Sequence, residues 1–372
     1  MGKFIPVNTP LIDGSESDYL QKCIDTGWVS SEGPFVEEFE HKFAKLCNRK
    51  HAVAVSSGSA ALEIAVHSLG IKKGDEVILP TFTIISCVAP LIRIGAIPVL
   101  IDADPLTWNM DVNQIEERIS SKTKAIMAVH IYGLPVDMDP LLTLAKRHGV
   151  LVIEDAAEAH GLLYKDRICG SLGDVSTFSF YPNKLITTGE GGMVLTDDDR
   201  IAEKCRSLRN LCFQKDRRFI HEELGWNFRM TNIQAALGLA QIERLDEFIK
   251  IKRIMGKRYT SLLKKLENVQ LPLKGTKYSE NIYWIYGLVL DADISDNAVS
   301  IMKKLKNCGI GTRPFFWPIH LQPVIKKMGL FRTDSFLVAE QISQKGFYIP
   351  SGLGLSNSDI NRVSSELCAI LD

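Results

Sequence analysis

The stretch "HAVAVSSGSAALEIAVHSLGIKKGDEVILP", residues 51–80, contains the pattern that decides the fold. It begins with a short apolar run, residues 51–57, continues with a helical pattern over residues 59–70, and ends with a second apolar run, residues 75–80. Short apolar runs are typical of buried strands, and apolar residues at helical spacing indicate an amphipathic helix. A strand, a helix and a second strand in this order predict a crossover unit, the building block of a parallel sheet.

The same alternation continues along the chain as far as about Ala156. Helical patterns and apolar runs follow one another at residues 84–95, 97–103, 111–119, 124–133, 139–149 and 150–157. We therefore expect an α/β protein in which a mostly parallel central sheet is flanked by helices. Beyond Ala156 the pattern changes to strands joined by turns, at residues 174–182 and 191–198, and these strands could pair differently from the earlier ones.

A second, smaller unit is predicted for the C-terminal part of the chain. Helical patterns fill residues 230–266 and lead into another set of strand and helix patterns beyond about Gly275. The length of 372 residues supports a division, because single hydrophobic cores rarely grow past roughly 250 to 300 residues. We predict a large α/β domain over residues 1–248 and a smaller C-terminal α/β domain over residues 249–372.

The composition favours a small molecule or a protein as the partner. The 44 basic and 44 acidic residues cancel, so net charge attracts neither nucleic acid nor an anionic membrane. The N-terminal residues lack the apolar run of a signal peptide, and no stretch reaches the roughly 20 apolar residues that span a bilayer. We therefore expect a cytoplasmic protein. The eight cysteines include no C-x-x-C pair, so neither a disulfide framework nor a metal site is indicated.

A single lysine, Lys184, lies between an aromatic strand pattern and a run of glycines in "STFSFYPNKLITTGEGGMVLTDDD", residues 176–199. A nucleotide-binding P-loop needs its glycines before the lysine and a helix after it, and the dinucleotide fingerprint G-x-G-x-x-G has a different spacing. Two alternatives remain. Lys184 is either a surface lysine in a glycine-rich turn or a Schiff-base lysine that holds pyridoxal phosphate.

Pyridoxal phosphate needs three kinds of group from a protein: an amine for its aldehyde, a carboxylate for its ring nitrogen, and N–H donors for its phosphate. Asp155 ends an apolar strand pattern, where open α/β sheets bind their ligands. Gly58 allows close approach of the backbone, and Ser59 begins a helix whose N-terminus can hold a phosphate. An ordinary helix cap explains each feature taken alone. Together with Lys184, they favour the cofactor.

Several segments make the sequence similar to the sugar-nucleotide aminotransferases (DegT-type) among the fold type I pyridoxal phosphate enzymes. They are "GWVSSEGPFVEEFE", "SSGSAAL", "PTFTIISC", "VHIYGLPVDMDP", "EDAAEAHG", "FSFYPNKLITTGEGGMV", "GWNFRMTNIQAALGLAQ" and "GTRPFFWPIH", which run from Gly27 to His320. The resemblance implies an aminotransferase that works as a homodimer with shared active sites. It would move the amino group of L-glutamate to a nucleotide-linked keto-deoxysugar and release 2-oxoglutarate.

The same resemblance implies a particular sugar and a set of cofactor contacts. The segments at residues 4–16 and 26–40 are among those that point to GDP-4-keto-6-deoxymannose and to O-antigen polysaccharide biosynthesis. Lys184 and Asp155 would be catalytic, with Lys184 carrying the cofactor and moving the proton while Asp155 pairs with the ring nitrogen. Besides Lys184, the cofactor would be bound by Gly58, Ser59, Ala157, Glu158, Ser179 and Asn227, the last from a second subunit.

Four further residues are candidates for contacts with the substrate: His160, Arg313, Trp317 and His320. Arginine suits a diphosphate and tryptophan suits a ring face. A buried histidine and ordinary surface packing are the alternatives for His160 and Trp317. Several relatives place an aromatic ring over the cofactor where this sequence has Ile84, so either Ile84 or Phe82 would cover the ring.

Three alternatives to this function remain open. Another nucleotide-sugar aminotransferase would share all of these residues. A deoxysugar 3-dehydratase uses the same scaffold with histidine in place of the lysine, so Lys184 argues against it. A regulatory protein that binds the cofactor without turnover is disfavoured by the presence of both Lys184 and Asp155.

Overall fold

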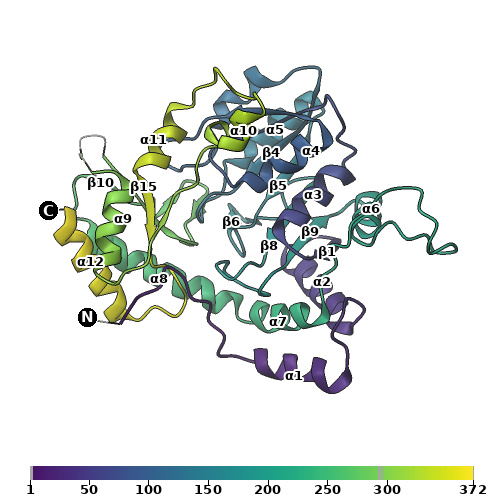
Figure 1. Ribbon diagram of the computed structural model, residues 1–372, viewed down its shortest axis with the longest axis horizontal. Coiled ribbons are helices and arrows are strands. Elements are labelled where there is room, and N and C mark those ends of the chain that lie inside the picture. Colours follow the sequence, from purple (N-terminus) through teal and green to yellow (C-terminus); the bar gives the residue numbers. More distant parts are fainter. Residues whose placement is uncertain (1–2, 292–293, 295, 372) are drawn as a thin grey trace.

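The computed structural model describes residues 3–291, 294 and 296–371, and its larger part is built on a seven-stranded sheet (Figure 1). Adjacent strands follow the order β1 (His51–Val55), β9 (Gly192–Thr196), β8 (Val175–Ser179), β5 (Leu151–Asp155), β4 (Thr123–Val129), β2 (Glu76–Pro80) and β3 (Ile97–Ile101). Only β9 is antiparallel to its neighbours. The expected mostly parallel sheet is confirmed, and so is the change of pairing beyond Ala156.

The strands of residues 51–80 are not neighbours in this sheet. β1 is an edge strand that pairs with β9, and four strands separate it from β2. The helix between them, α3 (Gly58–Ser68), packs against β8 and β9 instead. The alternation of patterns therefore identified the strands and the helix, but it carries no information on which strands become neighbours.

Successive residues of β1 point into two different cores, as the alternation of side chains along a strand requires. Val53 and Val55 belong to one core, and Ala52 and Ala54 belong to the other. The first core is covered by α3, α4 (Ala89–Ile94) and α6 (Asp199–Arg209). The second is covered by α2 (Pro34–Leu46), α5 (Met138–His148) and α7 (Asn232–Ile242). Helices thus flank both faces of the sheet, as an α/β class predicts.

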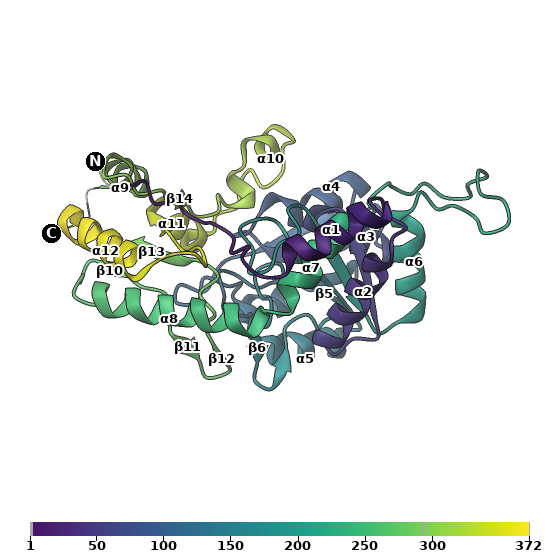
Figure 2. The ribbon, with the colours of Figure 1, turned by 90° about the horizontal axis from the view of Figure 1, so that it is seen from below.

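The smaller unit has an antiparallel sheet and a third core. Its strands follow the order β10 (Val269–Gln270), β13 (Tyr286–Leu290), β15 (Gly346–Ile349) and β14 (Arg313–Pro314). The core is completed by apolar side chains of α8 (Leu245–Leu263), α9 (Ala298–Asn307) and α12 (Asn357–Leu371). Figure 2 shows this unit beside the larger one, with α8 running along both.

Two segments tie the larger and smaller units together. The first half of α8 packs in the second core through Phe248, whereas its second half packs in the third core through Met255 and Tyr259. The predicted domain boundary at residues 248/249 falls inside this helix. The N-terminal segment also belongs to the smaller unit, because Ile5 packs in the third core and forms a parallel bridge with Ile310.

Short elements complete the fold. They are α1 (Glu16–Thr26), α10 (Pro323–Lys327), α11 (Leu337–Lys345), the 3-10 turns η1 (Ile85–Cys87), η2 (Val112–Gln114), η3 (Glu116–Arg118) and η4 (Ile319–Leu321), and the hairpins β6–β7 (Leu163–Tyr164, Arg167–Ile168) and β11–β12 (Gly275–Thr276, Ser279–Glu280). Among the described residues, no helix has both the length and the apolar character to cross a bilayer.

Between α6 and α7 a long segment leaves the body of the molecule, extends away from it in both views, and returns to it near Arg229, which forms a bridge with Val55 (Figures 1 and 2). We call this segment, residues 210–231, the arm. Phe219 and Leu224 on the arm are 81% and 91% exposed, which is unusual for large apolar side chains. An exposed apolar segment of this kind marks a surface that another molecule can cover.

Candidate functional site

Seven of the predicted cofactor residues line one cavity of about 410 Å³: Gly58, Ser59, Asp155, Ala157, Glu158, Ser179 and Lys184. The cavity lies at the carboxyl ends of β5 and β8 and at the N-terminus of α3. This is the edge at which open α/β sheets bind their ligands, and the volume is typical of small-molecule sites. The structure therefore brings together residues that lie far apart in the sequence.

Lys184 is held in the cavity by a turn after β8. Its N–H donates to the carbonyl oxygen of Tyr181 at 2.8 Å, and its side chain is 11% exposed. The Nζ atom lies 3.5 Å from Oε1 of Glu158 and 4.0 Å from the ring centroid of Trp284. Trp284 is itself fixed, because its Nε1–H donates to the carbonyl oxygen of Asn183 at 2.8 Å. The amine therefore faces the cavity from a defined position.

Asp155 ends β5 and is 3% exposed. Its Oδ1 accepts a hydrogen bond from the N–H of Ala157 at 3.0 Å. Burial raises the pKa of its carboxyl group, although this hydrogen bond and the charge of Lys184 act in the opposite direction. A cation bound in the cavity would favour the ionised carboxylate further.

Glu158 is a second buried carboxyl group, 6% exposed, beside Lys184. Its Oε2 accepts a hydrogen bond from the N–H of Tyr132 at 2.9 Å. Tyr132 has a left-handed backbone conformation, with φ of 56°. Burial raises the pKa of Glu158 to about 7, with Lys184 opposing the shift and Asp155 adding to it. Glu158 can therefore gain or lose a proton near neutral pH.

The N-terminus of α3 forms a cradle for an anion. The Ser57 side chain caps the helix by accepting from the N–H of Ala60 at 3.1 Å, and the first N–H groups of a helix have no partner within it. A Cβ atom on Gly58 would lie 2.7 Å from the Cβ of Ser179, so only glycine permits this close approach. The hydroxyls of Ser59 and Ser86 meet at 2.8 Å in the cavity wall. These groups fit a phosphate.

An aromatic wall closes the cavity on the side of the smaller unit. It consists of Tyr132, Trp284, Phe316 and Tyr348. The rings of Tyr132 and Phe316 stack with centroids 5.2 Å apart, and the N–H of Phe316 donates to the Tyr132 hydroxyl at 3.0 Å. None of these four residues was predicted from the sequence to lie at the site. Trp284 and Phe316 lie in aromatic clusters at residues 281–290 and 311–318, but a cluster of this kind does not show that a side chain reaches the cavity.

Of the two residues predicted to cover the ring, Ile84 reaches the cavity. Ile84 lines it and is 46% exposed. Phe82 is fully buried and packs against Tyr132, Phe315 and Phe316 on the far side of the wall. An aliphatic side chain therefore lines this part of the cavity.

The two histidines proposed as substrate contacts are buried outside the cavity lining. His160 is 1% exposed and packs among Phe43, Phe178 and Phe180. Burial lowers its pKa to about 3, so the ring is neutral. His320 is also 1% exposed, with Nδ1 2.7 Å from Oγ1 of Thr81 and Nε2 3.1 Å from a carboxylate oxygen of Glu340. Among the described residues neither ring nitrogen of His160 has a hydrogen-bond partner, whereas both nitrogens of His320 have one. The predicted substrate contacts of the two histidines stay predictions.

Three other candidates lie at the surface. Trp317 is 45% exposed, and its Nε1–H donates to the carbonyl oxygen of Leu321 at 3.1 Å. Arg313 is exposed at the start of β14. Asn227 lies on the arm, where its Oδ1 accepts from Nε of Arg229 at 3.0 Å. Within one chain none of the three lines the cavity, and their roles stay predictions.

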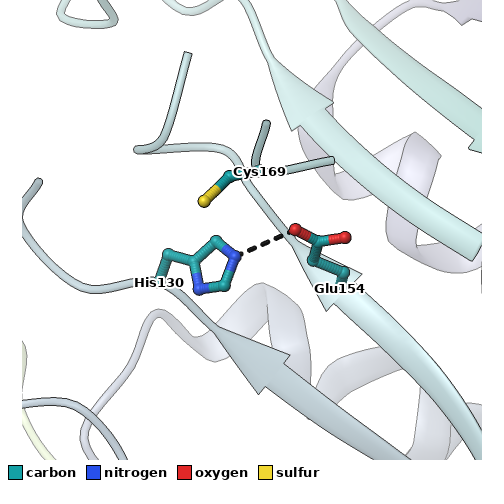
Figure 3. Close-up of side chains that lie close together, drawn as sticks. All are labelled: His130, Glu154 and Cys169. Carbon is teal, nitrogen blue, oxygen red and sulfur yellow. Dashed lines mark hydrogen bonds and ion pairs between the residues drawn. The ribbon is translucent and has the colours of Figure 1, made fainter. Parts of the chain in front are cut away.

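His130 lines the cavity and forms a buried cluster with Glu154 and Cys169, with possible ligand atoms within 4.8 Å of one another (Figure 3). The N–H of Val136 donates to Nδ1 of His130, so the ring carries its proton on Nε2 and donates it to Glu154 at 3.0 Å. Burial and the charge of Glu154 raise the pKa of Cys169, which keeps its thiol protonated. Glu154 also accepts from Gly170, Leu172, Gly173 and Ser176. We interpret the cluster as a structural hydrogen-bond network.

A buried lysine, a carboxylate at a strand end and an anion cradle around one cavity define a pyridoxal phosphate enzyme with the aminotransferase fold. The family model described as "DegT/DnrJ/EryC1/StrS aminotransferase family" matches residues 10–368, and the chain belongs to this family. The predicted family, the aminotransferase class and the cofactor are thereby confirmed.

Relatives match over nearly the whole chain. The GDP-perosamine synthase of Caulobacter vibrioides is 44% identical over 367 residues, covering 99% of this chain and 98% of the relative. The GDP-perosamine synthase of Vibrio cholerae is 41% identical, covering 96% and 97%. Among solved structures, DesV of S. venezuelae, in complex with a ketimine intermediate, has a TM-score of 0.88 and 32% identity, covering 96% and 94%.

Proposed function

We propose that this protein transfers the amino group of L-glutamate to the 4-keto carbon of GDP-4-keto-6-deoxy-D-mannose, which yields GDP-perosamine. The position of Lys184, with its amine in a cavity beside Asp155 and Glu158, carries the proposal. Two relatives named GDP-perosamine synthase, at 44% and 41% identity, support the choice of product. In this proposal the protein works in the cytoplasm and its product enters O-antigen polysaccharide.

The residues around the cavity have separate tasks in this proposal. Bound pyridoxal phosphate supplies an aldehyde that can carry nitrogen and a ring that can take up the electrons left when a substrate carbon loses its proton. Gly58, Ser59 and Ser179 hold the phosphate, and Asp155 holds the ring nitrogen. Lys184 anchors the aldehyde and moves a proton at Nζ, and the aromatic wall excludes water.

Glu158 assists Lys184 by exchanging a proton with it. An amine accepts a proton only in its neutral form, and a carboxylate close to it can take the excess proton. Glu158 lies 3.5 Å from Nζ, and its pKa of about 7 suits this task. The fixed N–H of Tyr132 keeps Oε2 occupied, which leaves Oε1 facing the lysine.

We also propose that two copies of the chain share their sites. The arm carries Asn227 and exposes Phe219 and Leu224. If a second copy of the chain covers these apolar side chains, Asn227 of the first copy would lie near the cavity of the second copy. Residues 210–231 would then complete the phosphate cradle of the partner.

One assay tests the reaction. The protein, loaded with pyridoxal phosphate, is incubated with ¹⁵N-labelled L-glutamate and GDP-4-keto-6-deoxymannose, and the products are identified by mass spectrometry. We expect ¹⁵N in the sugar and 2-oxoglutarate in equal amounts. A sugar that loses an oxygen without gaining nitrogen would indicate a dehydratase, and binding without products would indicate a regulatory protein. Preferred amination of a deoxythymidine-linked keto sugar would contradict the choice of nucleotide.

A further inference from the structure

The second carboxylate oxygen of Asp155 has a partner from a different part of the sheet, the thiol of Cys87. The Sγ atom of Cys87 lies 3.4 Å from Oδ2 and donates its proton to it, while Ala157 holds Oδ1. Cys87 is 0% exposed and Asp155 is 3% exposed, so solvent does not compete for this contact. Among the described residues, no other side chain forms a hydrogen bond with Asp155.

The local fold explains how a thiol reaches this position. The turn η1 follows β2, and only β4 separates β2 from β5 in the sheet. Ile84, just before this turn, and Ser86 within it line the cavity, whereas Cys87 is buried in the core. The hydroxyl of Thr83 lies 3.3 Å from the sulfur and can donate to it, which leaves the S–H for Asp155.

Cys87 can donate a hydrogen bond to Asp155 only while its thiol is protonated. Burial raises the pKa of the thiol well above its usual range, and the negative charge of Asp155 raises it further. The sulfur therefore keeps its proton near neutral pH. A thiol is a weak donor, so it orients a carboxylate while neutralising less of its charge than a hydroxyl or an N–H does.

We propose that Cys87 is a positioning residue for Asp155: its S–H fixes Oδ2 in the orientation in which the carboxylate meets the ring nitrogen of the cofactor. The weak bond leaves most of the negative charge of the carboxylate available to that nitrogen. This inference rests on the proposed pairing of Asp155 with the ring nitrogen.

The contact is tested without cofactor, through the S–H stretching band in the infrared spectrum. We expect one band of the wild type to vanish in Cys87→Ala and to move to higher frequency in Asp155→Ala, since the thiol then loses a charged acceptor. Cys205, which is equally buried in α6, supplies an internal reference band that stays in place. A Cys87 band that does not move in Asp155→Ala would overturn the contact.

The effect on Asp155 is tested by titrating cofactor-free protein with pyridoxal phosphate and following tryptophan fluorescence, to which Trp284 in the cavity wall contributes. Cys87→Ala should weaken binding roughly fivefold to tenfold, the equivalent of one modest hydrogen bond. Cys87→Ser should recover most of the loss, and Cys205→Ala should bind like the wild type.

The outcomes separate this inference from the proposed function. If Asp155→Ala binds the cofactor as tightly as the wild type, the pairing of Asp155 with the ring nitrogen is wrong. If Asp155→Ala binds weakly while Cys87→Ala binds like the wild type, the pairing stands and the role of Cys87 is overturned. Equal losses in Cys87→Ala and Cys205→Ala would also overturn it, because a general effect of truncation would then explain the result.

Discussion

Asp155 and Glu158 are three residues apart, and their surroundings differ in a way that suits two tasks. Asp155 has fixed donors on both oxygens, whereas Oε1 of Glu158 faces the amine of Lys184 at 3.5 Å. Neighbouring carboxyl groups with different partners commonly divide acid–base and charge-pairing roles in this way. The proton exchange is therefore expected at Glu158 and the pairing with the ring nitrogen of the cofactor at Asp155.

The pH dependence of stability tests the state of Glu158. Burial raises its pKa from 4.5 to about 7, so the folded state keeps a proton that the unfolded chain releases. This group contributes on the order of 3 kcal/mol to the free energy of unfolding. The contribution is fully present below about pH 4.5 and is lost as the pH rises through about 7. In cofactor-free protein, Glu158→Gln should therefore lose less stability than the wild type between about pH 5 and about pH 8 in urea titrations. An equal loss of stability with pH in Glu158→Gln and in the wild type would contradict the raised pKa of Glu158.

Covalent mapping tests the assignment of Lys184. Borohydride reduction of the loaded protein, followed by peptide mass mapping, should find the cofactor on Lys184. Lys184→Ala should lower the rate of amino transfer by at least the roughly 10²- to 10⁴-fold of a lost acid–base group. Lys146→Ala, on an exposed face of α5, serves as the control and should keep full activity. Cofactor found on any other lysine would contradict the assignment.

Single residues of the site could be predicted where a motif carries them. Lys184, Asp155 and Gly58 lie in segments with recognisable spacing, and the structure places all three at one cavity. Cys87 and Trp284 could not be predicted, because their contacts depend on which strands become neighbours and on how the smaller unit meets the larger one. His320 lies in a segment that resembles a site motif, but its side chain is buried in the core, where its ring nitrogens contact Thr81 and Glu340.

At the scale of elements, α8 links the site to the smaller unit through a buried lysine. Lys252 is 2% exposed and donates to the carbonyl oxygen of Trp284 at 2.7 Å and to that of Ser351. Burial lowers its pKa to about 7. Trp284 in turn packs on the amine of Lys184. The hydrogen bond from Lys252 on α8 therefore helps to fix the residue that contacts Lys184 in the cavity.

Removing the amine of Lys252 should therefore affect both stability and the site. Lys252→Met keeps the length of the side chain but leaves two buried carbonyl groups without this donor, which should cost about 1–3 kcal/mol in urea unfolding. The fluorescence of Trp284 should change as well. Lys250→Met, an exposed position on the same helix, should change neither quantity. Equal effects of the two variants would show that the buried bonds contribute nothing specific.

The types of the elements could be predicted better than their neighbours. Periodicity located β1, α3 and β2 correctly, because burial of one face imposes it on the sequence. The insertion of β9 beside β1 could not be predicted, since pairing is decided by contacts between segments separated by more than a hundred residues. The predicted domain boundary at residues 248/249 falls inside α8 for the same reason, because one continuous helix packs in two cores and only contacts between distant segments show this.

At the scale of the whole molecule, the arm should hold two copies together. Leu224→Glu places a charge on a side chain that is 91% exposed in one chain, and it should shift sedimentation toward a monomer. Leu337→Glu, at a position that is 74% exposed on α11, is the matched control and should leave sedimentation unchanged. A wild type that sediments as an active monomer at assay concentration would contradict the shared site.

Complementation provides an independent test of sharing. Lys184→Ala and Asn227→Ala should each be inactive or strongly impaired alone. When the two chains are mixed and allowed to exchange subunits, one site of each mixed dimer has both residues intact, so up to about half of the sites in such a dimer should recover activity. Failure to recover activity in dimers shown to be mixed would place Asn227 at its own site or at none.

The position of Ile5 in the third core has a consequence for folding during synthesis. The N-terminal segment pairs with Ile310, and the carbonyl oxygen of Lys3 accepts a bond from Arg362 across a separation of 359 residues. The first residues to emerge from the ribosome must therefore wait for almost the last residues before they can make these contacts. Contacts between such distant residues form slowly, so residues 3–8 should be the final part of the molecule to become protected from proteases as a nascent chain matures.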